Sequence, residues 1–405
     1  MIQDLIHKVR EEEVRNANFL HITANESQMS ETARMFLGSK FSERYYVGAG
    51  TDDVVDFGAF SQLGFKGVAA LVTEAENATK EMLGASIVNL SCLSGVHAMM
   101  CTILSTTEPG DTVMTVHHDH GGHFATSGIL QRTGRRNVNA TYNLSELKFD
   151  VEKTAQIFKE SGAKAFYMDV SYYLNPHNLR ELREALGKDA IIIYDASHTM
   201  GLIMGQTFQD PLNEGADVVC ANTHKTLPGP QKGMIAFRDK VFGEKANKIL
   251  KSGLYSSPHM HHIIALAITI LELRAFGKEY AQQIIANSNA IGKAFTDLNY
   301  DVRRANTGRF SENHQVHIFI DNKGQRLAFY KKLIENNIST NFDNPLGNRL
   351  FIRFGTQEIT RRGMKEKEMR QIASFIDRVF KGESIKEEII AFNKKFPKIF
   401  FSFDQ

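Results

Sequence analysis

The stretch from Ile191 to Phe237 constrains the fold of this chain more than any other part of the sequence. It contains two short apolar runs, IIIY and ADVVCA, which are rich in β-branched residues and bounded by turn residues. Such runs are typical of buried strands. The first run ends in Asp195, and the second is followed by Lys225 and a Pro-Gly-Pro turn. We expect the carboxyl ends of two neighbouring strands to bring this carboxylate and this amine into one crevice.

An aspartate and a lysine in this arrangement suit pyridoxal phosphate (PLP). The lysine amine condenses with the cofactor aldehyde, and the aspartate keeps the pyridine nitrogen protonated so that the ring accepts electrons. The spacing alone is weak evidence, because most Asp–Lys pairs in α/β proteins are solvated surface charges. The setting of Lys225 favours the cofactor, because this lysine directly follows a strand and lies between Thr223-His224 and the Pro/Gly turn.

The bulk composition indicates a globular protein. The chain has 405 residues, 42% of them hydrophobic, which is enough for a large core and a second, smaller domain. Because 48 basic residues balance 46 acidic ones, we expect neither a nucleic-acid partner nor a membrane partner. The charged N-terminal segment lacks the apolar region of a secretory signal, and Glu272 and Arg274 interrupt the longest apolar stretch, which is interpreted as too short to span a bilayer. We expect a cytoplasmic protein.

No metal site is predicted. The three cysteines (Cys92, Cys101 and Cys220) show neither metal nor redox spacing, which fits a reducing compartment, and Cys92 and Cys220 are interpreted as small core residues. A cluster of four histidines also suggests a metal, but only Asp119 adds a further ligand and the nearby glycine pair indicates a tight loop. These histidines are His117, His118, His120 and His123.

The segments DASHTMGL and ADVVCANTHKTLPGPQKG resemble the cofactor segment of serine hydroxymethyltransferases, which are PLP enzymes of the aspartate-aminotransferase fold. The resemblance runs from Phe19 to Phe380. It implies an α/β protein with a large PLP-binding domain, a mostly parallel sheet and a smaller α+β C-terminal domain. The alternation of strands and helices over residues 137–190 agrees with this fold class. We expect an N-terminal helical arm (1–45), the PLP-binding domain (46–262), and a linking helix with the small domain (263–405).

Several further residues are candidates for cofactor binding. Ser94, Gly95 and Val96 lie between a strand and an apolar helix, where a hydroxyl and backbone N–H groups form a natural phosphate site. The family has a Ser-Gly turn here for the PLP phosphate. The resemblance also implies that His123 stacks on the cofactor ring and that Ser171 approaches a cofactor oxygen. His198 and Thr223 complete the cofactor-binding candidates, and the catalytic candidates are Lys225, Glu43, His123 and His224.

The resemblance implies roles in the substrate site for Glu43 and for four further residues. Glu43 corresponds to the acid/base carboxylate beside the substrate hydroxyl, although the residue pattern alone favours a solvated glutamate. Either Tyr45 or Tyr46 takes the role of a tyrosine that binds substrate across a dimer interface. Asn25 lies in the matching N-terminal motif. Arg353, in the motif LFIRFGT, corresponds to the arginine that binds the amino-acid α-carboxylate bidentately. A homodimer, or a dimer of dimers with sites at the interface, is expected.

Three departures from the family concern its substrates. Tyr255-Ser256-Ser257-Pro258 replaces a glycine-rich segment that reaches the phosphate of a neighbouring subunit. His118 replaces a leucine that packs on folate, and the loop NFDNPLGNRL is shortened. These changes favour a reaction that does not use tetrahydrofolate.

We therefore predict a PLP-dependent enzyme that cleaves and forms the Cα–Cβ bond of a serine- or threonine-like β-hydroxy-α-amino acid. The reaction passes through a glycine quinonoid and exchanges an aldehyde, as in an aldolase or transaldolase. The alternatives are a serine hydroxymethyltransferase that uses tetrahydrofolate, or racemisation, decarboxylation or transamination on the same scaffold. A non-catalytic scaffold is the least favoured interpretation, because Lys225, Asp195, His123 and Arg353 are all present.

Overall fold

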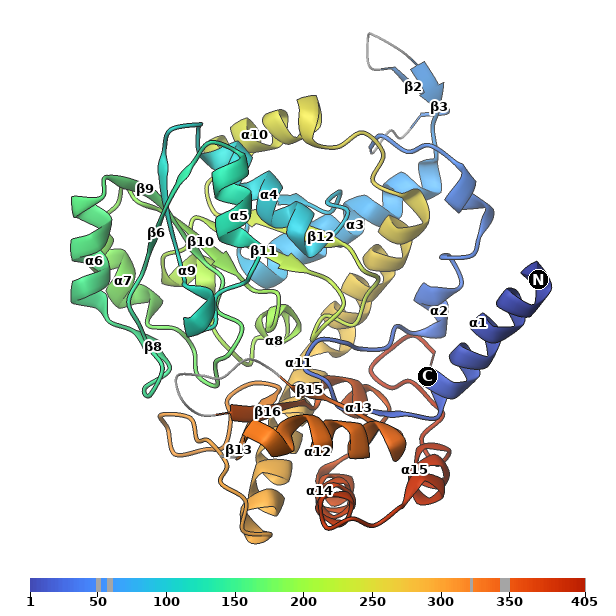
Figure 1. Cartoon of the computed structure of the whole chain (residues 1–405). Helices are drawn as coiled ribbons and strands as arrows, with labels where there is room; N and C mark the ends of the chain where they lie inside the picture. Colours follow the sequence, from blue (N-terminus) through green and yellow to red (C-terminus); the bar gives the residue numbers. More distant parts are fainter. Residues whose placement is uncertain (49–51, 57–60, 321–322, 343–349, 405) are drawn as a thin grey trace. The chain divides into compact units, whose positions relative to one another are not determined.

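A computed structural model of the chain describes residues 1–48, 52–56, 61–320, 323–342 and 350–404 (Figure 1). The chain divides into two compact units. Unit 1 comprises Met1–Glu26 and Gln283–Phe400, and unit 2 comprises Ser27–Gln282 and Phe401–Gln405. These boundaries differ from those expected from the sequence, which lie after residues 45 and 262. The first 26 residues group with unit 1 because β1 (Leu20–His21) pairs with β14 (Ile338–Ser339).

Unit 2 is built on a seven-stranded sheet of order β4-β12-β11-β10-β9-β5-β6. Strand β12 runs antiparallel to both of its neighbours, and the remaining pairs are parallel. The expected mostly parallel sheet is thereby confirmed. The strands are β4 (Ile87–Asn89), β5 (Thr112–Thr115), β6 (Arg136–Asn139), β9 (Ala163–Met168), β10 (Ile191–Asp195), β11 (Val218–Asn222) and β12 (Gly233–Phe237).

The two apolar runs of the central stretch form β10 and β11. They pair in parallel, with Asp195 opposite Cys220, and both strands are largely buried, as a continuous apolar run predicts. Strands β4, β5 and β9 run in the same direction as this pair. The segments that follow all five strands therefore leave the sheet at one edge, where open α/β sheets bind ligands.

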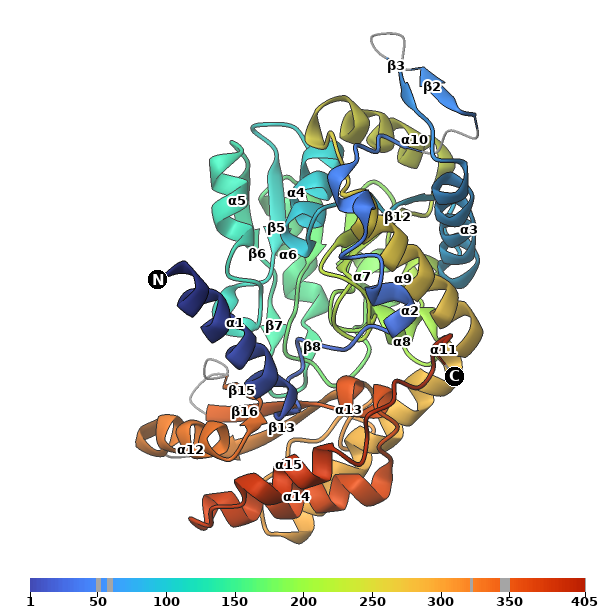
Figure 2. The ribbon, with the colours of Figure 1, turned by 90° about the vertical axis from the view of Figure 1, so that its right-hand side faces the viewer.

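Helices surround this sheet (Figures 1 and 2). The sequence explains where two of these helices end and begin. Gly84 ends α3 in the left-handed conformation (φ 65°). The Ser94 hydroxyl caps the N-terminus of α4 by accepting a hydrogen bond from the His97 amide. The helices are α2 (Glu31–Arg34), α3 (Lys66–Leu83), α4 (Gly95–Thr106), α5 (Thr126–Arg132), α6 (Val151–Glu160), α7 (Leu179–Leu186), α8 (Met200–Met204), α9 (Pro211–Glu214) and α10 (Lys240–Ile249).

Short elements complete unit 2. The hairpins are β2 (Val54–Asp56) with β3 (Ser61–Leu63) and β7 (Tyr142–Asn143) with β8 (Lys148–Phe149). The 3₁₀ turns are η1 (Lys40–Glu43) and η2 (His118–His120), and η3 (Leu250–Leu254) is a π-helical turn. The core between sheet and helices includes Cys92, Met99, Ile103, Ile193 and Ile235.

Unit 1 has the α+β architecture expected of the C-terminal domain. Its three-stranded antiparallel sheet has the order β13-β16-β15, and its core contains Leu20, Phe295, Ile318, Phe354 and Ile376. Its other elements are α1 (Ile2–Ala17), β13 (Gln315–Ile320), α12 (Lys323–Glu335), β15 (Asn341–Phe342), β16 (Leu350–Gly355), α13 (Gln357–Arg361), α14 (Glu366–Phe380) and α15 (Lys386–Asn393).

Helix α11 (Met260–Asp297) has 38 residues and contributes to both units. In the part of the chain that the structure describes, it alone has the length and apolar composition to cross a membrane, so the interpretation that this stretch is too short is wrong. Its most apolar window has a mean hydropathy of 1.3, and 67% of that window is buried inside the protein. This burial is what the core helix of a folded domain shows.

Candidate active site

Asp195 ends β10, and two donors fix its carboxylate. The Tyr167 hydroxyl, from the neighbouring strand β9, donates to Oδ2 at 2.7 Å, and the Ser197 amide donates to Oδ1 at 2.9 Å. Burial, reinforced by the negative charge of Asp195, raises the pKa of Tyr167 well above its usual value, so this hydroxyl keeps its proton. The sheet edge therefore holds one oriented carboxylate.

Lys225 follows β11 in a turn that hydrogen bonds hold in place. Its Nζ lies 3.1 Å from His198 Nε2, and the His198 carbonyl accepts a bond from the Thr226 hydroxyl at 2.8 Å. The Thr223 hydroxyl donates to the Pro230 carbonyl across the turn at 2.5 Å. These contacts place the Lys225 amine, together with the turns that carry His198 and His224, at the same sheet edge as Asp195.

His224 is a mostly buried neutral imidazole beside this lysine. Burial lowers its pKa to about 4, and the charge of Lys225 acts in the same direction. Its Nδ1 is buried and has no hydrogen-bond partner among the residues that the structure describes. A buried nitrogen without a partner is unfavourable, so this atom is suited to contact a bound ligand.

The turn before α4 is shaped for close approach to the sheet. A side chain at Gly95 would place its Cβ 2.7 Å from the Cβ of Asn222, the last residue of β11. Val96 is 39% exposed, so the amides at this helix start lie near the surface of unit 2. Together with the Ser94 hydroxyl, these amides make up the helix N-terminus at which the sequence predicts phosphate binding.

His123 lies in the loop that follows β5, and a buried carboxylate organises that loop. Asp169, just after β9, accepts the His123 amide at 3.2 Å and the Thr126 hydroxyl at 2.6 Å. Burial lowers the pKa of the His123 side chain; Asp195 opposes this shift and Lys225 adds to it, so all three groups lie within electrostatic range. The His123 ring is half-buried and stacks on the exposed Phe124, with a centroid distance of 4.7 Å.

The segment after β9 also meets the β5 loop. The Ser171 amide donates to the Gly121 carbonyl at 2.7 Å, which joins Ser171 to the loop that carries His123. A cavity of about 220 Å³ opens beside this loop. Its lining is largely polar: Thr115, Val116, His117, His118, His123, Ser127, Asn137 and Asn139.

The predicted acid/base and tyrosine candidates of unit 2 have different exposures. The Glu43 side chain is 67% exposed and lies 3.9 Å from Arg44. Tyr46 is buried, and burial followed by the charge of Glu76 raises its pKa to about 12. Tyr45 is 49% exposed and its hydroxyl bonds the Ser256 hydroxyl.

Unit 1 carries the other two predicted substrate residues, and it brings them together. Arg353, in the middle of β16, is buried, and its Nη2 donates to the Asn25 side-chain oxygen at 3.0 Å. The polar contact explains how a guanidinium is accommodated in an apolar strand.

Two of the functional side chains found here are absent from the sequence prediction. Tyr167 and Asp169 both lie in the segment KAFYMDVSYY, in which only Ser171 is a sequence-predicted site residue. Asp169 carries the same signal as Asp195, an acidic residue directly after a buried strand. Tyr167 gives no such signal, because its contact with Asp195 depends on the pairing of β9 with β10.

The comparisons with known proteins agree with this geometry. A model of the serine hydroxymethyltransferase family matches residues 2–376. The chain belongs to the serine hydroxymethyltransferase family. Serine hydroxymethyltransferase of Methanocella arvoryzae is 34% identical over 95% of this chain and 92% of its own length.

Two transaldolases are also similar to this chain. Fluorothreonine transaldolase of Streptantibioticus cattleyicolor is 36% identical over 91% of this chain, which spans only 58% of that protein's length. The crystal structure of L-threonine transaldolase from Pseudomonas fluorescens in its internal aldimine state superimposes with a TM-score of 0.91 at 28% identity. The alignment covers 100% of this chain and 94% of the other. The fold of PLP-dependent transferases is thereby confirmed.

The residues of unit 2 fit the family cofactor, PLP. The sheet edge offers a lysine amine, an oriented carboxylate, a capped helix N-terminus where only glycine fits, and the unpartnered nitrogen of His224. The aldehyde of PLP requires an amine, its pyridine nitrogen requires a carboxylate, and its phosphate requires N–H and O–H donors.

Proposed function

We propose that this chain is a PLP-dependent transaldolase or aldolase that acts on threonine-like β-hydroxy-α-amino acids without tetrahydrofolate. The observation that carries the proposal is the set of Lys225, Asp195 and His123 at one sheet edge, with Asp195 held by Tyr167. The similarity to two transaldolases supports the choice of substrate class.

PLP, when bound, accepts the electron pair that is left on the amino-acid α-carbon when a bond to that carbon breaks. Lys225 would hold the cofactor aldehyde, and Asp195 would keep the proton on the pyridine nitrogen. The Ser94 hydroxyl and the amides of Gly95 and Val96 would bind the phosphate. Ser171, His198 and Thr223 belong to the same proposed cofactor site.

The remaining residues act on the substrate. Arg353, held by Asn25, would bind the α-carboxylate with its guanidinium fork. Glu43 would take the proton from the β-hydroxyl. Burial favours the neutral form of His123 and of His224, so each imidazole keeps one unprotonated ring nitrogen that can accept a hydrogen bond. The exposed Tyr45 is the better candidate than the buried Tyr46 for a contact across an interface.

The contacts around His118 support a reaction without folate. His118 replaces the apolar residue that packs on folate in the family, and its Nε2 lies 2.9 Å from the Asp119 carboxylate. A polar pair of His118 and Asp119 is a poor surface for the apolar contact that folate makes in the family. Residues 343–349 of the shortened loop lie outside the described residues. The polar cavity beside His123 has room for a small acceptor aldehyde.

A homo-oligomer is part of the proposal, as is a cytoplasmic location. Every residue of α1 is exposed in the single chain, and an apolar stripe runs along this helix. A stripe of this kind needs a partner surface, and closed homo-oligomers are the commonest assemblies.

Incubating the PLP-loaded protein with L-threonine and a second aldehyde tests the proposed reaction. We expect release of acetaldehyde and a new β-hydroxy-α-amino acid, with or without tetrahydrofolate. Lys225→Ala should abolish both products. Borohydride reduction of the PLP-loaded protein should leave the cofactor covalently attached to Lys225. Lys232, whose buried amine donates to the Pro258 carbonyl, should carry no cofactor.

The second candidate is serine hydroxymethyltransferase activity, which the similarity to the Methanocella arvoryzae enzyme favours. Serine consumption that accelerates on adding tetrahydrofolate, without acetaldehyde release from threonine, would establish this activity and refute the transaldolase proposal.

A further inference from the structure

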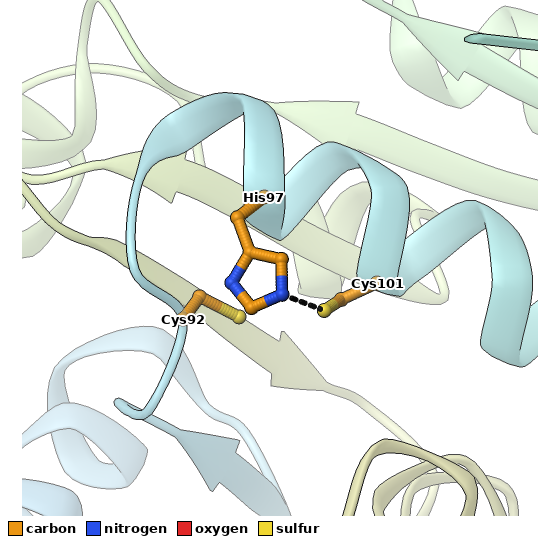
Figure 3. A group of neighbouring side chains, drawn as sticks. All are labelled: Cys92, His97 and Cys101. Carbon is orange, nitrogen blue, oxygen red and sulfur yellow. Dashed lines mark hydrogen bonds between the residues drawn. The ribbon is translucent and has the colours of Figure 1, made fainter. Parts of the chain in front are cut away.

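Two buried cysteines and a histidine converge beside the start of α4 (Figure 3). Cys92 precedes the turn, and His97 and Cys101 lie one helical turn apart on α4. The two sulfur atoms and a histidine nitrogen all lie within 4.8 Å of one another, and Cys101 Sγ is 3.4 Å from His97 Nε2. None of these residues belongs to the proposed catalytic site.

Hydrogen bonds from the backbone determine which nitrogen of His97 carries the proton. The Leu93 amide donates to His97 Nδ1 at 2.9 Å, so Nδ1 is unprotonated. The proton of the neutral ring therefore lies on Nε2, which is 2.9 Å from the Leu254 carbonyl and faces Cys101. The single Nε2–H of His97 is thus shared between the Leu254 carbonyl at 2.9 Å and the Cys101 sulfur at 3.4 Å.

This tautomer argues against a metal ion. A metal at Nε2 needs the lone pair of that nitrogen, and the proton would then have to move to Nδ1, which faces the Leu93 N–H. Two thiols and an imidazole otherwise suit a soft metal. The observed hydrogen bonds instead favour a thiolate at Cys101, with Cys92 as a neighbouring thiol.

We propose that Cys101 and Cys92 form an oxidisable dithiol, in which Cys101 attacks a small hydroperoxide and Cys92 then closes a disulfide. The Cys101 thiolate attacks one peroxide oxygen, the O–O bond breaks, and a sulfenic acid and hydroxide form. The Cys92 thiol then displaces the sulfenic hydroxyl, which leaves as water when the S–S bond forms. The sulfur pair loses two electrons, and the hydroperoxide is reduced to water or an alcohol.

The electrostatics of the pair agree with this assignment of roles. Hydrogen bonding from Cys92, and then from His97, lowers the pKa of Cys101 to about 6, although burial opposes the shift. The hydrogen bond to Cys101 raises the pKa of Cys92 well above its usual value, and burial adds to that rise. Cys101 is therefore the nucleophile at neutral pH, and Cys92 keeps its proton until the second step.

One residue that contacts His97 also lines a cavity. Leu254, whose carbonyl accepts the His97 bond, lines a cavity of about 730 Å³ together with Tyr255, Ser256 and Tyr45. His97 itself is partly exposed, whereas both sulfur atoms belong to buried residues. The burial of both sulfur atoms favours hydrogen peroxide and small alkyl hydroperoxides over bulky disulfides as oxidants.

Thiol counting on the reduced, PLP-loaded protein tests the proposal. The chain has three cysteines, so treatment with hydrogen peroxide should reduce the thiols measured after unfolding from three to one. Peptide mapping should find Cys92 linked to Cys101. Cys92→Ser should instead accumulate a sulfenic acid at Cys101 that a dimedone probe captures.

Two variants serve as controls. Cys220→Ser keeps the pair and should still lose two thiols. His97→Gln keeps a donor for Leu254 but removes the imidazole, and it should slow thiol loss at pH 7 by about tenfold, because less of Cys101 is ionised.

Three results would overturn the proposal: three thiols that survive peroxide, oxidation of Cys220 before the pair, or one equivalent of Zn²⁺ that binds and protects two thiols. Because the wild-type protein alone decides the thiol count, poor folding of a variant cannot mask the result.

Discussion

The hydroxyl of Tyr167 is the contact on which the proposed role of Asp195 depends most directly. Tyr167→Phe removes the 2.7 Å bond and keeps the ring. We expect kcat for threonine cleavage to fall roughly tenfold or more, as is typical when a residue that orients a ligating group is removed. Steady-state kinetics of the PLP-loaded variant measure this loss.

The matched control is Tyr173→Phe. Tyr173 is equally buried, and its hydroxyl is hydrogen-bonded to the Thr199 hydroxyl at 2.9 Å. An equal fall of kcat in both variants would show that general destabilisation, and not the orientation of Asp195, causes the effect.

Asp169 gives a residue-level prediction about pH. Burial raises its pKa to about 7, above its ordinary value near 3.8. Between these values the folded protein binds a proton that the unfolded chain releases, so the contribution of Asp169 to stability falls as pH rises from about 4 to 7.

Asp169→Asn removes this titration. Compared with wild type, the variant should show a weaker decrease of melting temperature across that pH window in a series of calorimetric scans. Identical pH profiles for the two proteins would contradict the raised pKa.

At the scale of elements, one close approach in the site joins the start of α4 to the end of β11. Gly95→Ala places a Cβ 2.7 Å from Asn222, so α4 must shift. Overpacking of this kind lowers the free energy of unfolding by about 1–3 kcal/mol, and PLP affinity should fall as well. Denaturant titration and cofactor binding measure the two effects.

Gly128→Ala is the control for helix propensity. Gly128 lies in α5, and an added Cβ there meets no described atom within 4 Å. Alanine should raise stability by about 0.5–1 kcal/mol. If Gly95→Ala were equally stabilising, the close approach of α4 to β11 would be refuted.

The elements of the site differ in how far the sequence predicts them. Asp195 and Lys225 are predictable because strand patterns and turn residues locate both strand ends. Tyr167 is not, because its role depends on which strand lies next to β10. The pair of Cys92 and Cys101 is not predictable from the sequence for a similar reason. His97 and Cys101 have helical spacing, but the approach of Cys92 depends on the path of the turn before α4.

At the scale of the whole molecule, α1 carries the prediction about assembly. Ile2, Leu5, Ile6 and Val9 follow helical spacing and are 41–70% exposed. Because this stripe is expected to contact a second copy, Leu5→Asp with Val9→Asp should shift the assembly toward monomer in size-exclusion chromatography with light scattering.

Glu11→Gln, on the opposite face of α1, should leave the mass unchanged. If the double variant keeps the wild-type mass, α1 is not part of the interface.

The position of β12 has a consequence for how the protein is made. Within the central sheet β4 pairs with β12, and Asn89 lies opposite Ile235, although the two strands are far apart in the chain. The Ser94 turn after β4 therefore gains its place in the sheet only when β12 is available. Because chains emerge from the ribosome N-terminus first, the proposed phosphate site at Ser94 is complete only after residues beyond Lys225 are synthesised. A truncated nascent chain that ends before β12 thus lacks a complete cofactor site, even though it already contains the lysine and the aspartate.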